Sequence, residues 1–228
     1  MDYNLSVEEH LSKFMYRVFG FMALALATTA ATAYWVSTQP SIYFYFFQKP
    51  MALIAIFMVQ LTLVIILGIF IKRMPTWVAI LLFFLYAISI GFSLSLFFII
   101  YTQTSIFSTF LVASSMFAAM ALYGYFTKTD LTTIGNLAYM GLFGLIIGLL
   151  INMYFKNSTA DYIFSAAGVI LFTVLTAYDV QKIKKLAQYL LDKNEGINKI
   201  AILGALTLYL DFINLFLFLL RFTGKERN

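Results

Sequence analysis

The feature that most limits the fold of this chain is the length of its uncharged apolar stretches. From Met74 to Thr127 the sequence contains no charged residue. Over the whole chain, hydrophobic residues make up 62% and charged residues only 11%, whereas soluble domains carry about 25% charged residues. So few charges cannot cover a water-facing surface. The sequence therefore predicts an integral membrane protein and excludes a soluble enzyme.

Seven apolar stretches are long enough to cross a bilayer, which takes about 20 residues in a helix. The polar run Tyr101–Ser105 divides the longest uncharged stretch into two of them. Stretches of this length are typical of helices rather than of the short alternating strands of a barrel. The predicted fold class is all-α integral membrane, as a single domain of seven transmembrane helices. The predicted spans are about 14–36, 51–71, 77–100, 107–125, 132–154, 162–180 with a helical extension to about 191, and 200–222.

The distribution of Lys and Arg indicates how the chain is oriented. The net charge of +5 would suggest nucleic acid as a partner of a soluble protein, but here the basic residues flank apolar stretches. They are more numerous in the N-terminal tail and the loops on its side, which predicts a cytoplasmic N-terminus and an external C-terminus. Basic residues after the seventh span weaken this pattern. A re-entrant seventh segment that returns to the cytoplasmic side is the alternative.

Motifs of enzymatic chemistry are missing from the sequence. There is no cysteine, and the single histidine, His10, lies in the N-terminal tail, which excludes a thiolate metal site and a cysteine nucleophile. Phosphate-binding loops and dinucleotide fingerprints are also absent. We therefore expect neither an enzymatic activity nor a cofactor.

Two acidic residues lie within the predicted spans. Asp179 is near the end of the sixth span and Asp211 is in the middle of the seventh. An ionised carboxylate is costly in a membrane and by default marks a functional site. The turn signal between these spans is Lys193–Gly196, and both aspartates are equally distant from residue 195. In an antiparallel helical hairpin centred on that residue, the two carboxyl groups would lie level.

Paired carboxyl groups in a low-dielectric medium share a proton, because two adjacent negative charges repel each other. Asp179 and Asp211 could therefore form a proton-operated latch or, when deprotonated, bind a divalent cation. The plain structural alternative is a hydrogen bond that joins two helices.

A polar stripe surrounds Asp211 on the seventh span. Thr207, Asp211 and Asn214 follow one another at steps of three and four residues, which places them on one helical face. Thr207 and Asn214 could line a polar pathway, and a helix with such a face should be interior rather than lipid-facing. Polar packing between helices is the alternative. At the end of the second span, Lys72 and Arg73 fit membrane anchors, although the Arg73 guanidinium suits a carboxylate.

The sequence resembles the Bax inhibitor (TMBIM) family at two places. Leu206–Phe216, with the sequence LTLYLDFINLF, and the following Leu219–Arg221 resemble the C-terminal signature of that family. Ala177–Ile183, AYDVQKI, resembles its second signature. The resemblance covers the whole chain in length and number of spans. It implies seven helices with a central, buried seventh helix, and the short C-terminal tail points to a bacterial member in the inner membrane.

What the resemblance implies about function is a pH-sensitive calcium leak. Asp179 and Asp211 match the paired aspartates that act as pH sensor and gate, and they are a candidate transient calcium site. Arg73 fits the position of an arginine that latches to the pair. Gln60 and Thr62 stand where some relatives carry an acidic residue, so no further cation ligand is expected there.

Three functions compete at this point. The first is a calcium-permeable leak channel, with the lipid bilayer, calcium ions and protons as partners. The alternative is a non-conducting regulator or scaffold that modulates a membrane protease or a stress response through a membrane-protein partner. An intramembrane aspartyl protease would also use two aspartates, but it needs a Gly-x-Gly sequence before the second one, and Leu208–Leu210 stands there instead.

Overall fold

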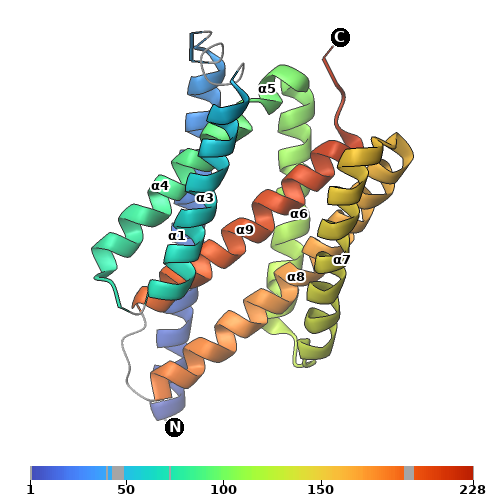
Figure 1. Ribbon diagram of the computed structural model, residues 1–228. Coiled ribbons are helices and arrows are strands. Elements are labelled where there is room, and N and C mark those ends of the chain that lie inside the picture. Colours follow the sequence, from blue (N-terminus) through green and yellow to red (C-terminus); the bar gives the residue numbers. More distant parts are fainter. Residues whose placement is uncertain (1, 40, 43–48, 72, 193–197, 228) are drawn as a thin grey trace. The chain divides into compact units, whose positions relative to one another are not determined.

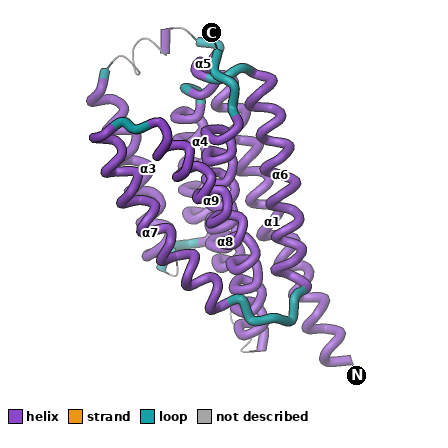
Figure 2. Tube along the Cα trace, turned by 90° about the vertical axis from the view of Figure 1, so that its right-hand side faces the viewer, coloured by secondary structure: helices purple, strands orange, loops and turns teal. Residues whose placement is uncertain are grey.

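The structure of this protein is a computed structural model that describes residues 2–39, 41–42, 49–71, 73–192 and 198–227. This part of the chain is helical and contains no β-strand (Figure 2). The all-α prediction is therefore confirmed. The helices are α1 (Asp2–Ser37), α3 (Pro50–Phe70), α4 (Thr76–Leu94), α5 (Phe97–Ile100), α6 (Gln103–Phe126), α7 (Thr132–Phe155), α8 (Ser158–Asp192) and α9 (Asn198–Thr223).

Seven helical stretches of the described residues are long and apolar enough to cross a membrane, which confirms the predicted number of spans. The predicted bounds differ most at the ends, because helical hydrogen bonding continues through polar residues whereas apolar composition marks only the part inside the bilayer. The turn signal Lys193–Gly196 and the side chain of Lys72 lie outside the described residues. The seven stretches are Glu8–Ser37, Met51–Phe70, Thr76–Ile100, Gln103–Phe126, Thr132–Phe155, Ser158–Leu191 and Lys199–Thr223.

The chain divides into two compact units. The first comprises Met1–Tyr101, Ala187–Tyr209 and Arg227, and the second comprises Thr102–Leu186, Leu210–Glu226 and Asn228. Helices α8 and α9 contribute to both. This division does not test the prediction of a single domain, which stays a prediction.

In the first unit, α1 packs closely against α4 (Figure 1). A Cβ atom placed on Gly91 of α4 would lie 2.6 Å from the carbonyl oxygen of Thr29 on α1, so only glycine allows this approach. The Thr29 hydroxyl also lies 2.7 Å from the hydroxyl of Tyr209 on α9 and 3.0 Å from the Ala87 carbonyl oxygen. These buried polar groups satisfy one another and join three helices where water is absent.

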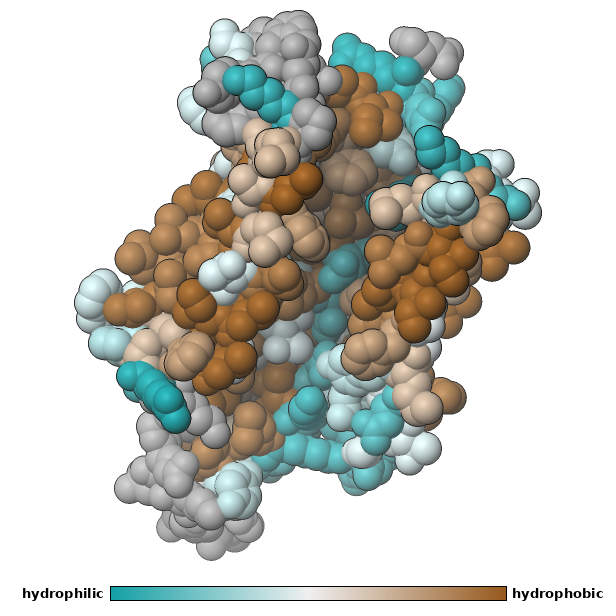
Figure 3. Space-filling model, in the orientation of Figure 1, coloured by the Kyte–Doolittle hydropathy of each residue, from teal (hydrophilic) through white to brown (hydrophobic). Residues whose placement is uncertain are grey.

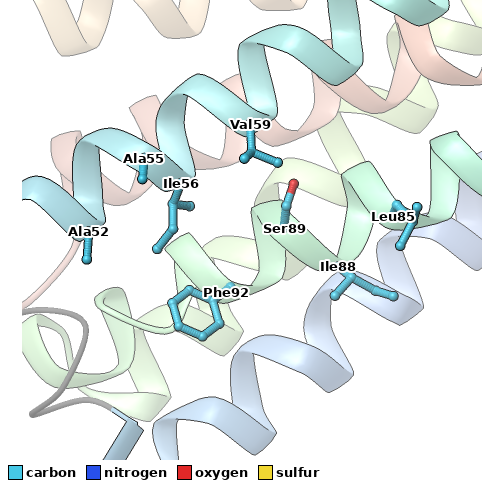
Figure 4. A pocket seen from close by; sticks show the side chains of 8 residues that line it. All are labelled: Ala52, Ala55, Ile56, Val59, Leu85, Ile88, Ser89 and Phe92. Carbon is cyan, nitrogen blue, oxygen red and sulfur yellow. The ribbon is translucent and has the colours of Figure 1, made fainter.

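Helices α3 and α4 are joined by Gln60, whose side-chain amide donates hydrogen bonds to the Ser93 hydroxyl (2.6 Å) and the Ser89 carbonyl oxygen (2.8 Å). Beside this contact a shallow apolar groove of about 450 Å³ runs between the two helices (Figure 4). Its small alanines leave open space on the lipid-facing side. The groove is lined by Ala52, Ala55, Ile56 and Val59 of α3 and by Leu85, Ile88, Ser89 and Phe92 of α4.

Large apolar side chains are exposed along α3 and α7, and they form broad hydrophobic surfaces over each of these helices (Figure 3). A soluble monomer rarely exposes contiguous apolar patches of this extent. Hydrocarbon solvates such a surface without cost, so these faces fit contact with lipid. Examples are Ile54, Phe57 and Ile69 on α3 and Leu137, Met140 and Phe143 on α7.

Helix α9 is the most buried of the seven spans. Buried residues make up 72% of its most apolar stretch, against 50% for α8 and 33% or less for the others. Buried side chains lie all around it, since Leu206, Leu208 and Tyr209 point in different directions and each is at most 3% exposed. Because side chains are buried on every side of α9, it is an interior helix. The predicted buried seventh helix is therefore confirmed.

The C-terminal tail is held by two hydrogen bonds within the second unit. The Thr102 amide donates to the Lys225 carbonyl oxygen (3.1 Å), and the Lys225 amide donates to the Ser105 hydroxyl (2.9 Å). The tail thus lies on the same side as the loop between the third and fourth spans. Four crossings separate these two segments if α9 spans the membrane, whereas a re-entrant α9 would place them on opposite sides. The structure therefore favours the full crossing over the re-entrant alternative.

Candidate functional site

The second unit brings the two membrane-embedded aspartates together. Asp179 on α8 is 1% exposed and Asp211 on α9 is 5% exposed. The two carboxyl groups are near enough to act on each other electrostatically. Two adjacent negative charges repel each other in a low-dielectric medium, which favours a proton shared by the two groups. The site is therefore a pair of neighbouring carboxyl groups between two helices, and the shared proton stays a prediction.

The register between α8 and α9 explains why these side chains meet. The rings of Phe172 on α8 and Phe218 on α9 stack with their centroids 5.7 Å apart, and this pair is also equally distant from residue 195. Farther from the turn, the rings of Tyr162 and Phe222 lie 4.6 Å apart. Residue numbers rise along one helix as they fall along the other, so the two helices run antiparallel. Asp179 and Asp211 lie level within this hairpin.

A tyrosine on α7 is a third member of the site. The Tyr139 hydroxyl donates to both carboxyl oxygens of Asp179, at 3.1 and 2.9 Å. The Tyr139 ring packs edge-on against the ring of Tyr178, with centroids 6.0 Å apart. The ammonium of Lys182, one helical turn after Asp179, lies 6.0 Å from the Tyr139 ring and 5.6 Å from the Tyr178 ring, within the range of a cation–π interaction.

The two carboxyl groups differ in how they are satisfied. Oδ2 of Asp211 is buried and has no hydrogen-bond partner in the part of the chain that the structure describes. Calcium takes six to eight oxygen ligands in proteins, and no group of three or more His, Cys, Asp or Glu side chains gathers among the described residues. Two carboxyl groups alone do not make a resident calcium site, and transient calcium binding stays a prediction.

Beyond the site, α8 holds the loop between α6 and α7. The Gln181 side chain accepts from the Leu131 amide (3.0 Å) and donates to the Thr129 carbonyl oxygen (2.8 Å). The Lys184 ammonium donates to the Tyr125 carbonyl oxygen at 2.7 Å. These contacts begin two residues after Asp179, so they tie this loop to the helix that carries the site.

An exposed ion pair also joins α8 to the loop between α6 and α7. We expect this ion pair to be insensitive to pH in the physiological range. The Lys185 ammonium lies 2.8 Å from Asp130; its hydrogen bond, with those from Thr132, lowers the pKa of the Asp130 carboxyl to about 2. Because the pKa of Asp130 is lower in the folded protein than in the unfolded chain, the ion pair stabilises the fold at pH values above the unfolded pKa. This stabilisation is lost as the pH falls through about 2. The Asp130→Asn variant should therefore unfold with the wild-type pH dependence between about pH 5 and 8, measured by thermal denaturation in detergent.

Known proteins match this chain over nearly its whole length. A model of the family described as "Inhibitor of apoptosis-promoting Bax1" matches residues 11–228. The inner membrane protein YbhL of Escherichia coli K12 is 42% identical over 218 residues, which cover 95% of this chain and 93% of YbhL. A protein of Borreliella burgdorferi is 43% identical over 217 residues, which cover 95% of this chain and 94% of that protein.

The chain belongs to the Bax inhibitor family.

Thr207 and Asn214 were also predicted to belong to the site of this Bax inhibitor family protein. Their side chains form hydrogen bonds within their own helix. The Thr207 hydroxyl donates to the Leu203 carbonyl oxygen (3.1 Å), and the Asn214 amide donates to the Leu210 carbonyl oxygen (2.8 Å). Both side chains are half-buried. Their role in lining a polar pathway stays a prediction.

The proposed latch residue of this Bax inhibitor family protein lies in the other unit. Arg73 follows α3 in the first unit, and its side chain is exposed, so contact with the aspartate pair stays a prediction. Within the second unit, the basic group that acts electrostatically on Asp179 is Lys182. Its spacing, three residues after Asp179 on one helix, could have identified it from the sequence. Tyr139 has no such signal, because it comes from a different helix.

Proposed function

We propose that this Bax inhibitor family protein is a pH-sensitive leak pathway for cations, with calcium as the permeant ion, and that Asp179 and Asp211 form its gate. The observation that supports this proposal is a pair of neighbouring buried carboxyl groups on two transmembrane helices, one of them with a buried oxygen that has no hydrogen-bond partner among the described residues. Ionisable groups at this depth are costly to the fold. A site that only joined two helices would not need two acids.

The proton count of the pair supplies the gating mechanism. With one shared proton the pair carries a single negative charge, which a basic residue can hold. A second proton neutralises the pair and weakens that attraction. Loss of the shared proton places two negative charges side by side, which drives the helices apart or attracts a divalent cation. Each change alters the force between α8 and α9, so the flux should depend strongly on pH.

We further propose a bacterial inner membrane location with a cytoplasmic N-terminus, no enzymatic activity, no cofactor and no nucleic-acid partner. The location is supported by YbhL of Escherichia coli, which is named as an inner membrane protein, and the orientation by the excess of Lys and Arg on one side.

The test is calcium flux into liposomes that contain the purified protein, measured with an enclosed calcium dye across about pH 5 to 8. The leak proposal expects flux that changes steeply with pH. Flux equal to that of protein-free liposomes at every pH would contradict it and would favour the alternative, a non-conducting regulator that acts through a membrane-protein partner.

Replacing Arg73 by alanine should raise the basal leak if its guanidinium holds the pair. We expect an increase of at least about fivefold at neutral pH, the low end of the coupling between two sites in a protein, while the pH dependence remains because the carboxyl pair is intact. The control is Lys128→Ala, which removes another exposed basic side chain. Equal fluxes in both variants and the wild type would exclude Arg73 as the latch.

A further inference from the structure

We propose that Tyr139 is a positioning residue for the aspartate pair: its hydroxyl fixes the carboxyl group of Asp179 and leaves Oδ2 of Asp211 as the open end of the pair. The contact itself stands on geometry, and its effect on gating rests on the proposed function. In the sequence alone, the two aspartates are equivalent. The structure assigns them different surroundings.

Tyr139 holds the Asp179 carboxyl group through a hydrogen bond to each of its oxygens. Tyr139 offers one hydroxyl hydrogen, and it lies 3.1 and 2.9 Å from the two oxygens of Asp179. A donor placed between both oxygens fixes the rotation of the carboxyl group as well as its position. Such a bond is strongest when the acceptor is ionised. Asp179 is therefore the member of the pair that is built to carry negative charge.

The donor, Tyr139, is held in place by a neighbouring ring. The Tyr139 ring packs edge-on against the Tyr178 ring at an interplanar angle of 82°. The Tyr178 ring in turn lies directly over Gly135 of α7, where any Cβ atom would overlap it. Since Gly135 and Tyr139 are one helical turn apart on α7, the same helix supplies both the hydroxyl and the surface on which the neighbouring ring rests. The Tyr139 ring is thus held by a neighbouring ring that itself rests on α7.

Asp211 differs from Asp179 in its hydrogen-bond partners. This residue is 5% exposed, and its Oδ2 has no hydrogen-bond partner among the described residues. An ionised oxygen left in that state inside a membrane would be very costly, whereas the oxygen of a protonated carboxyl group is much less so. The charge of a singly protonated pair therefore resides on Asp179 and the proton on Asp211.

The titratable groups around the pair are few. In the described part of the second unit, α7 contributes Tyr139, α8 contributes Tyr178 and Lys182, and α9 contributes Asp211 itself. Lys182 is exposed, so salt screens its charge, whereas the Tyr139 hydrogen bond is not screened. The two contributions can therefore be separated by ionic strength.

The variant that tests this inference is Tyr139→Phe, which removes the hydroxyl and keeps the ring. Its matched control is Tyr178→Phe, which removes a hydroxyl from the neighbouring ring but leaves the hydrogen bonds from Tyr139 to Asp179 in place. In liposomes we expect Tyr139→Phe to move the midpoint of the flux–pH curve upward by about one pH unit, because an ionised Asp179 loses its donor. Tyr178→Phe should leave the midpoint unchanged. Equal shifts in both variants would overturn the proposal.

A second measurement reports the contact without flux. Infrared spectra of protein labelled with ¹³C-aspartate should show a shifted carboxylate band in Tyr139→Phe and not in Tyr178→Phe. In an Asp179→Asn background, Tyr139→Phe should cause no such shift. A shifted band together with absent wild-type flux would refute the leak and keep the contact, whereas an unshifted band in a protein with pH-dependent flux would refute the role of Tyr139 and keep the leak.

Discussion

In liposomes that contain the Asp179→Asn variant, calcium flux is expected to vary by less than about twofold from about pH 5 to 8. Wild-type flux is expected to change by up to about tenfold per pH unit near its midpoint, the factor for a gate that takes up one proton. Asparagine nearly keeps the size of aspartate, and its side-chain oxygen can still accept a hydrogen bond from the Tyr139 hydroxyl, but its amide does not titrate. The variant therefore removes the titrating group from the gate with little change in packing.

The control for this experiment is Asp130→Asn. Asp130 is an aspartate of the same unit, but it is exposed and paired with Lys185 outside the membrane. Because the pKa of its carboxyl is about 2, it stays ionised over the whole pH range, and its loss should leave the flux–pH curve unchanged. Should Asp179→Asn and Asp211→Asn both retain the wild-type curve, the aspartate pair is not the gate.

The largest effect on folding is expected for Gly124→Leu. A Cβ atom on Gly124 of α6 would lie 2.9 Å from Cα of Ala177 and would overlap its carbonyl group. Backbone atoms cannot turn aside as a side chain can, so α6 and α8 would have to separate. We expect a loss of about 3 kcal/mol, the upper part of the usual range for overpacking, seen as a lower midpoint of thermal unfolding in detergent and a lower yield of folded protein.

Gly144→Leu is the matched control for this substitution. Gly144 lies on α7, and a Cβ atom there would meet no neighbouring atom within 4 Å. Leucine should be accepted at this position, and its better helix propensity should offset any loss. Equal unfolding midpoints for the two leucine variants would show that the approach of α6 to α8 is not a close one. Because Ala177 is two residues before Asp179, Gly124→Leu should also disturb the flux of any protein that still folds.

How much of the candidate site could be predicted from the sequence depends on where each contact originates. Asp179 and Asp211 could be found because charge is rare in a bilayer and because one short turn relates the two helices, which makes their register a matter of residue spacing. Lys182 lies on the same helix as Asp179 and was equally predictable from the sequence. Tyr139 was not, because the contact between α7 and α8 joins segments with no fixed spacing, and tyrosine is common in this chain.

The sequence by itself determined the membrane class, the seven helices and the membership in the Bax inhibitor family. The physical reason is that hydrocarbon requires every spanning segment to be apolar and helical, a requirement that can be recognised in each segment separately. Only the tertiary structure decided which glycines permit close helix packing and which way the tail lies. It also decided that Tyr139 holds Asp179, while one oxygen of Asp211 has no hydrogen-bond partner within the described part of the chain. These features depend on side chains from different helices, and their distances follow from packing rather than from any pattern within one segment.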